Sequence, residues 1–236
     1  YKGIGTYATL KTTQSKAMFD NDSTTYYTSG NGQNTGDWIG ADLGCVRQVS
    51  EVRILQGRNS VDDVDYFDNT VLEYSVDRKE WKALTGELKK QYIINWKTDS
   101  PVEARYIRIK KLKSDKRNWA AVRTFEVNPT TPERLNFPVE ADNLEAAMYG
   151  FDENPCTSFT NKGTLTMGIE KDVKSYTLLL KLAPGKSLVC RQLNAKGKVL
   201  ATTTIDSSFC KVELVKKAAK LQIEGSAEIF EIIPEK

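Results

Sequence analysis

The sequence predicts an all-β fold made of two tandem β-sandwich domains, and three observations support this prediction. Apolar and polar residues alternate with period two in short runs, which buries one face of a strand and wets the other. Gly, Asn and Asp separate these runs, as they do in antiparallel sandwiches. Motifs near the start and the end of the first half recur, in the same order, in the second half.

The alternating runs are clearest at four places, which we expect to be strands: residues 51–54, 72–77, 107–110 and 221–223. In the first of them Val52 and Ile54 alternate with charged neighbours. One short helix is expected around residues 143–148. Two tryptophans lie inside strand patterns and are expected in the core, Trp38 and Trp81, whereas Trp96 fits either the core or the surface.

A linker is predicted near residue 130, because residues 128–133 hold two prolines and two threonines between periodic stretches. All four tryptophans precede it. We therefore expect domains at residues 1–129 and 134–236. Residues 19–27 align with residues 151–159, since Phe, Asp and Thr recur at the same spacing, and residues 125–129 correspond to residues 230–234. The second domain is thus expected to be a second copy of the fold.

Composition excludes several functions. The chain has no His, so it has no Ser-His-Asp triad, imidazole zinc site or histidine general base. A net charge of +3 argues against a nucleic-acid binder, and no apolar stretch reaches the ~20 residues of a membrane span. The four cysteines show no CxxC spacing. They are expected as buried thiols, with a Cys190–Cys210 bridge as the alternative in an exported protein: Cys45, Cys156, Cys190 and Cys210.

The turn after Phe19 places Asp20, Asp22 and Thr25 close together. Clustered oxygens of this kind can bind a hard cation such as calcium. The alternative is an Asx/Thr turn whose side chains satisfy their own backbone. The spacing leaves both interpretations open.

Five ordered motifs give the first half a family resemblance: Phe19-Asp20, residues 38–44, the run from Leu72 to Trp81, residues 105–109 and residues 125–127. Residues 3–129 resemble the coagulation-factor type C, or discoidin, domain, whose bacterial members are the family 32 carbohydrate-binding modules. More narrowly, four segments resemble the modules attached to bacterial β-N-acetylglucosaminidases and hyaluronidase-type enzymes of glycoside hydrolase family 84: residues 56–58, 65–67, 72–75 and 118–123.

The resemblance implies an eight-stranded, galactose-binding-like jelly roll with a structural calcium and a shallow sugar site on loops at one end. The implied calcium ligands are Asp20, Asp22, Thr25, a carbonyl near Ala17 and an acid on the last strand. Members usually have Glu directly after the position of Arg123, where this sequence has Thr124. Glu126 lies two residues further on and is the candidate in its place.

A sugar site needs an aromatic face for the pyranose ring and planar polar groups for its hydroxyls. Trp119 follows the charged residues 116–118, so it suits an exposed loop better than a core, although packing beneath the loop is an alternative. The implied site residues are Arg58, Asn59, Asp65, Tyr66, Phe67, Asn118 and Trp119. Arg58 alternatively pairs with Asp62, Asp63 or Asp65, and Phe67 fits the core equally well. Residues 182–188 hold no aromatic, so a spacer or docking role is expected for the second domain.

The leading hypothesis is a non-catalytic, monomeric carbohydrate-binding region tethered to a secreted, periplasmic or surface bacterial glycosidase. Its partners would be mucin, glycosaminoglycan or N-glycan chains that contain N-acetylglucosamine or galactose. A second hypothesis is a protein- or phospholipid-binding discoidin domain. The acidic loop at residues 57–69 argues against it, because it should repel anionic lipid. A third is a glycosidase that uses Asp63 and Asp65, which share one loop with no implied cleft.

Overall fold

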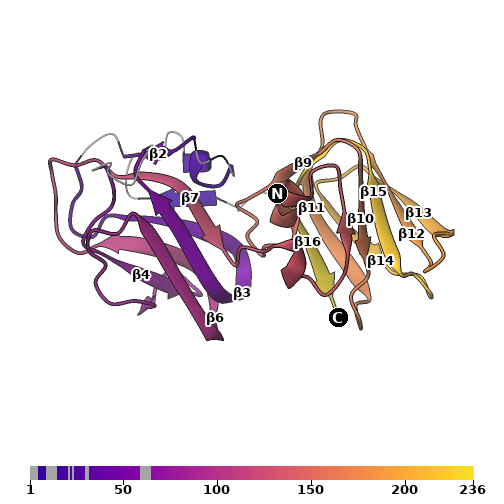
Figure 1. Ribbon diagram of the computed structural model, residues 1–236, viewed down its shortest axis with the longest axis horizontal. Helices are drawn as coiled ribbons and strands as arrows, with labels where there is room; N and C mark the ends of the chain where they lie inside the picture. The colour runs from indigo at the N-terminus through magenta and orange to yellow at the C-terminus, as the bar shows by residue number, and fades with distance from the viewer. Residues whose placement is uncertain (1–4, 9–14, 21, 23, 30–31, 59–64) are drawn as a thin grey trace. The chain divides into compact units, whose positions relative to one another are not determined.

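The computed structural model describes residues 5–8, 15–20, 22, 24–29, 32–58 and 65–236 (Figure 1). Nearly all of its regular elements are strands, which confirms the all-β prediction. The chain forms two compact units, residues 2–129 and residues 130–236, called here the first and the second unit. No described helix is long and apolar enough to cross a membrane. Asn59, Asp62 and Asp63 lie outside the described residues.

The described residues of the first unit form one sheet with the strand order β2-β7-β3-β6-β4-β5, and β1 also pairs with β3. Its elements are β1 (Gly5–Ala8), the 3-10 helix η1 (Ser15–Met18), β2 (Tyr27–Thr28), β3 (Trp38–Gln56), β4 (Thr70–Ser75), β5 (Lys82–Ala83), β6 (Ile93–Lys111) and β7 (Ala121–Val127).

The long strands β3 and β6 pair twice and so belong to both layers of a sandwich (Figure 1). The first half of β3 pairs with the second half of β6. After two shifts in register, the second half of β3 pairs with the first half of β6. Strand β4 extends the first of these layers and β7 extends the second. Residues from both layers fill the core, and Val52, Ile54, Ile107 and Ile109 are fully buried as their alternation predicts.

The alternation expected at residues 72–77 holds only at its start. Leu72 is fully buried, but Ser75 is 2% exposed and Val76 is 46% exposed. The strand ends at Ser75, so Val76 lies beyond the sheet and no partner layer covers it.

Trp38 and Trp81 are not in the core, which corrects the prediction for both. Each is half-buried on the outer face of the sheet, beside the guanidinium of Arg108. That guanidinium lies 3.5 Å from the centre of the Trp81 ring and forms an ion pair with Glu73 at 2.7 Å. Both indoles lie over a cation–carboxylate pair, and in β3 Trp38 precedes the fully buried Ile39. Trp96 is also half-buried.

The second unit is a sandwich of a five-stranded sheet, β13-β12-β15-β10-β8, and a four-stranded sheet, β14-β11-β16-β9. Buried side chains from both sheets, such as Leu178 and Leu221, form one core cluster. Its elements are η2 (Pro132–Arg134), β8 (Val139–Glu140), α1 (Leu144–Ala147), η3 (Met148–Gly150), β9 (Phe159–Asn161), β10 (Thr164–Gly168), β11 (Ser175–Lys181), β12 (Leu188–Leu193), β13 (Val199–Ile205), β14 (Phe209–Glu213), β15 (Lys220–Glu224) and β16 (Ala227–Glu235).

The short helix expected around residues 143–148 is confirmed as α1. The side chain of Asn143 caps its first turn, because Oδ1 accepts a hydrogen bond from the backbone N–H of Ala146 at 3.0 Å. Such a cap satisfies a backbone donor that the helix itself leaves without a partner.

Candidate functional site

Four segments meet at one end of the first unit, joined by hydrogen bonds that involve at least one backbone group. They are residues 32–37, the described parts of loop 57–69, residues 88–92 and loop 111–121. Loop 111–121 bonds to each of the first two, since Asp115 and Gln33 exchange both of their backbone bonds and the Ala121 N–H donates to the Asp65 carbonyl. We call this region the loop end.

Gln33 fixes the two loops that carry the predicted aromatic residues. Its side chain is fully buried, and its Nε2 donates to the carbonyl oxygens of Tyr66 at 3.1 Å and Trp119 at 2.8 Å. A buried amide that bridges two backbone carbonyls holds both loops in one geometry, because breaking either bond leaves a buried acceptor without a partner. Gln33 thus fixes the position of the Tyr66 backbone relative to the Trp119 backbone.

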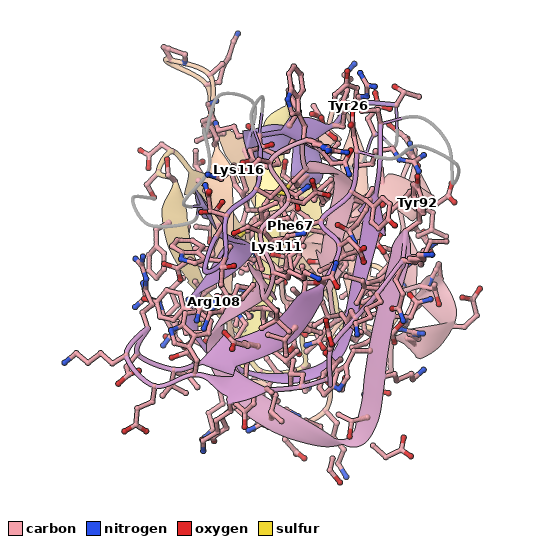
Figure 2. The ribbon with its side chains drawn as sticks, turned by 90° about the vertical axis from the view of Figure 1, so that its left-hand side faces the viewer. Tyr26, Phe67, Tyr92, Arg108, Lys111 and Lys116 are labelled. Carbon is pink, nitrogen blue, oxygen red and sulfur yellow. The ribbon has the colours of Figure 1, made fainter. Side chains whose placement is uncertain are left out.

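Phe67 does not face a ligand, so its predicted sugar contact is corrected. It is 1% exposed and packs beneath its loop, where its backbone N–H donates to Oε1 of the buried Gln56 at 2.9 Å. The ammonium of Lys111 lies beside its ring, 5.5 Å from the centroid (Figure 2). Phe67 therefore supports the site from below.

Lys111 is a buried cation under the loop end, with 1% of its surface exposed. Its ammonium donates to the carbonyl of Asp68. Burial lowers the pKa of this ammonium, while the nearby carboxylates of Asp68, Asp115 and Asp37 act in the opposite direction. Lys111 thus ties loop 57–69 to the end of β6 at some cost in desolvation.

Three described side chains of loop 57–69, those of Arg58, Asp65 and Tyr66, contact their neighbours. The Tyr66 ring lies 4.6 Å from the Tyr92 ring, centroid to centroid. Burial, followed by the charges of Asp68 and Asp115, raises the pKa of Tyr66. Arg58 Nε pairs with Asp65 Oδ2 at 2.7 Å, as one of the alternatives expected. Asp65 therefore orients Arg58.

Trp119 is exposed at the loop end, with 45% of its surface accessible. It follows a turn held by Asp115, whose carboxylate accepts bonds from the backbone N–H groups of Arg117 and Asn118 and from the Asn118 side chain. These bonds lower the pKa of Asp115, although burial acts in the opposite direction. Asn118 is therefore a support of the turn, and Trp119 is the ring that the turn presents to solvent.

Sequence reasoning missed three buried polar residues that build this site. Two of them had a usable signal, because Gln56 continues the inward register of Val52 and Ile54, and Lys111 continues that of Ile107 and Ile109. Period two places such residues inside whatever their polarity. Gln33 lies outside any periodic run and had no comparable signal.

The turn at residues 17–25 gathers four oxygen atoms. Thr25 Oγ1 lies 2.6 Å from Asp20 Oδ2, 3.0 Å from the Asp22 carbonyl and 3.4 Å from the Ala17 carbonyl. Carboxylate, carbonyl and hydroxyl oxygens are the ligands that calcium takes. Glu126 instead lies beside Arg53, with Oε2 3.6 Å from its guanidinium, and burial raises the pKa of Glu126. The oxygen types of the turn suit a cation, and the distances between them are also those of hydrogen bonds from the Thr25 hydroxyl. Among the described residues, no contact joins Glu126 to the turn.

The same turn recurs in the second unit with buried residues. Thr157 Oγ1 donates to Asp152 Oδ2 at 2.8 Å and lies 2.7 Å from the Asn154 carbonyl. The backbone N–H of Asp22 donates to Asp20 Oδ1, and that of Asn154 donates to Asp152 Oδ1, each at 3.0 Å. The matching geometry supports the internal repeat and shows that the pattern also serves as a self-satisfied turn. No group of three or more His, Cys, Asp or Glu side chains suited to a metal occurs among the described residues.

Comparison with known families identifies the first unit. The model of the F5/8 type C domain matches residues 6–126. The chain belongs to this family. The match spans β1 to β7 and therefore includes the loop end of the F5/8 type C unit. No curated protein matches the chain.

Several solved structures resemble the chain at low identity. A family 32 carbohydrate-binding module of C. perfringens NanJ in complex with galactose has 17% identity and a TM-score of 0.44, covering 52% of this chain and 92% of its own. A chitosan-binding module from Paenibacillus sp. IK-5 in complex with chitotriose has 16% identity and a TM-score of 0.44, and the match covers 52% of this chain and 95% of the module. A fucolectin from striped bass (Morone saxatilis) serum has 11% identity and a TM-score of 0.45, and the match covers 98% of this chain and 95% of the fucolectin.

Proposed function

We propose that the F5/8 type C unit is a non-catalytic carbohydrate-binding module that uses the loop end as its sugar site. The observation that carries the proposal is the exposed Trp119 ring on a loop that Gln33 holds against the loop of Tyr66. An accessible indole in a fixed geometry suits the apolar face of a pyranose, because little conformational entropy is lost on binding.

Polar groups beside the indole complete the proposed site. The Tyr66 hydroxyl and the Arg58–Asp65 pair lie on one of the two loops, and Asn118, whose Nδ2 is bonded to Asp115, offers its Oδ1 on the other. Planar groups of this kind give hydroxyls oriented donors and acceptors. A site this shallow buries little area, so we expect weak monovalent affinity that gains strength from avidity.

The resemblance of residues 56–58, 65–67, 72–75 and 118–123 to modules of family 84 enzymes supports a finer proposal. The chain would be part of a secreted, periplasmic or surface bacterial glycoside hydrolase of the β-N-acetylglucosaminidase or hyaluronidase type. It would bind glycans that contain N-acetylglucosamine or galactose, as a monomer. The second unit, whose segment at residues 182–188 holds no aromatic, would serve as a spacer.

The experiment that tests the proposal is a glycan array probed with the full chain, followed by calorimetric titration with N-acetyllactosamine, which contains both expected sugars. Binding to a set of terminal galactose or N-acetylglucosamine glycans supports it, and an array without any bound glycan overturns it. A parallel incubation with an aryl N-acetylglucosaminide should release no phenol, and turnover that follows the protein through purification would contradict the non-catalytic assignment.

Calcium at the turn of residues 17–25 is part of the proposal, with Asp20 Oδ2, the Ala17 and Asp22 carbonyls and Thr25 Oγ1 as ligands. A cation bound only by the folded state stabilises that state by mass action. All four tryptophans lie in the first unit, so tryptophan fluorescence reports its unfolding alone. Chelation should lower that unfolding temperature, excess calcium should restore it, and Asp20→Asn should remove the response. An identical melt with and without chelator means that the turn binds no metal.

A further inference from the structure

The described acidic residues of the loop end use their carboxylates in hydrogen bonds and an ion pair with neighbouring groups. Asp115 accepts three hydrogen bonds from residues 117–118, and Asp65 pairs with Arg58. Asp68 accepts bonds from the backbone N–H of Lys90 and from Asn69, and Asp37 accepts one from the backbone N–H of Asn34. The described acids of this region therefore act as internal braces.

Three cations that share loop 111–121 with Trp119 have no such partners among the described residues. Lys113, Lys116 and Arg117 are all exposed, and none of them has a hydrogen bond or ion pair from its side chain to any described residue. Lys116 and Arg117 form the apex of the Asp115 turn. Three positive charges without a side-chain partner among the described residues thus lie within six residues of Trp119, in the same loop.

The backbone under these cations is held rigidly. The backbone of Lys116 packs directly against Gly32, where a Cβ would lie 2.6 Å from the Lys116 Cα. Asp115 and Gln33 exchange backbone bonds at 2.8 and 2.9 Å. The backbone that carries Lys116 and Arg117 is therefore held in place two to three residues before Trp119, so that both side chains start from a fixed position near the proposed sugar site.

We infer that this site prefers an acidic saccharide, with Trp119 stacking on the sugar ring and with Lys116 and Arg117 pairing with a carboxylate or sulfate on it. The inference rests on the proposed sugar-binding function and names the class of sugar. Arg117 suits either anion, because its planar guanidinium can donate two parallel hydrogen bonds to carboxylate or sulfate oxygens.

The test compares matched ligands by titration of the full chain at about 0.02 M salt, where charges are weakly screened, and at about 0.5 M salt, where they are strongly screened. Hyaluronan oligosaccharide carries carboxylates alone, chondroitin sulfate oligosaccharide adds sulfates, and N-acetyllactosamine is neutral. Phosphatidylserine vesicles test the lipid alternative. We expect the acidic oligosaccharides to bind about tenfold more tightly than the neutral one at low salt, with the difference shrinking at high salt.

The variant Lys116→Glu/Arg117→Glu should remove this preference, so that the acidic oligosaccharides bind no more tightly than the neutral one. Its matched control is Lys196→Glu/Lys198→Glu in the second unit, because these exposed lysines also lie on a turn braced by one side chain, that of Asn194. The control should bind all ligands as the wild type does. Trp119→Ala should weaken acidic and neutral ligands together.

Each other outcome has a definite meaning. Equal binding of neutral and acidic sugars, or no effect of the charge reversal, overturns the inference and leaves the proposed function standing. Acidic binding that survives Trp119→Ala is adsorption of a polyanion and also overturns it. Binding to vesicles without binding to any saccharide, or no binding at all, overturns both the inference and the proposed function.

Discussion

Gly32→Ala should disturb the sugar site through a single methyl group. A Cβ at position 32 would lie 2.6 Å from both the Cα and the carbonyl oxygen of Lys116. Ordinary contact begins near 3.4 Å, so the two backbones must separate by about 0.8 Å, and overpacking of this kind costs about 1–3 kcal/mol. The neighbouring Gln33 bonds to the Trp119 carbonyl, so the displacement should reach Trp119.

The assay is urea unfolding of the full chain followed by tryptophan fluorescence, together with titration by N-acetyllactosamine. We expect a loss of about 1–3 kcal/mol in the free energy of unfolding of the first unit, and weaker sugar binding. The matched control is Gly86→Ala, because a Cβ there meets nothing within 4 Å. The reasoning is refuted if Gly32→Ala and Gly86→Ala agree within about 0.5 kcal/mol and both bind sugar normally.

Two further predictions follow from buried ionisable groups. Burial lowers the pKa of Lys111 below its ordinary 10.5, so the unfolded chain holds more protons between the two values, and the free energy of unfolding should rise with pH in that window. Lys111→Met should remove this rise in urea titrations, and equal slopes would contradict the argument. Burial raises the pKa of Cys190 to about 12, so iodoacetamide at about pH 8 should modify the exposed Cys45 and spare Cys190 in peptide mass analysis. Similar rates for both thiols would show that Cys190 is not buried.

The strands could be predicted from the sequence because their physical signal is local. Alternation at residues 51–54 and 107–110 reports which side chains face the core, and those side chains are buried. The end of the strand within residues 72–77 was harder to predict, because no local sequence pattern marks the point where a strand leaves its partner. Val76 follows the pattern but lies beyond the end of β4.

The aromatic residues show where local reasoning stops. Trp38 and Trp81 have the pattern of core residues, yet they cover the Arg108–Glu73 pair that three strands bring together. Phe67 lies beside Tyr66 in the sequence, and only the positions of Gln56 and Lys111 decide which ring turns inward. Burial of an aromatic depends on partners distant in sequence, and periodicity does not report them.

The measurement that tests the central claim most directly is sugar binding by Trp119→Ala. Because 45% of this residue is accessible, its truncation should change the free energy of unfolding by less than about 1 kcal/mol. Loss of the stacking face should weaken binding of N-acetyllactosamine at least about tenfold. The control is Phe209→Ala, since Phe209 is an even more exposed aromatic, at 59%, in the second unit. It should bind as the wild type does. Normal binding by Trp119→Ala in a folded protein would contradict the claim that the loop end is the sugar site.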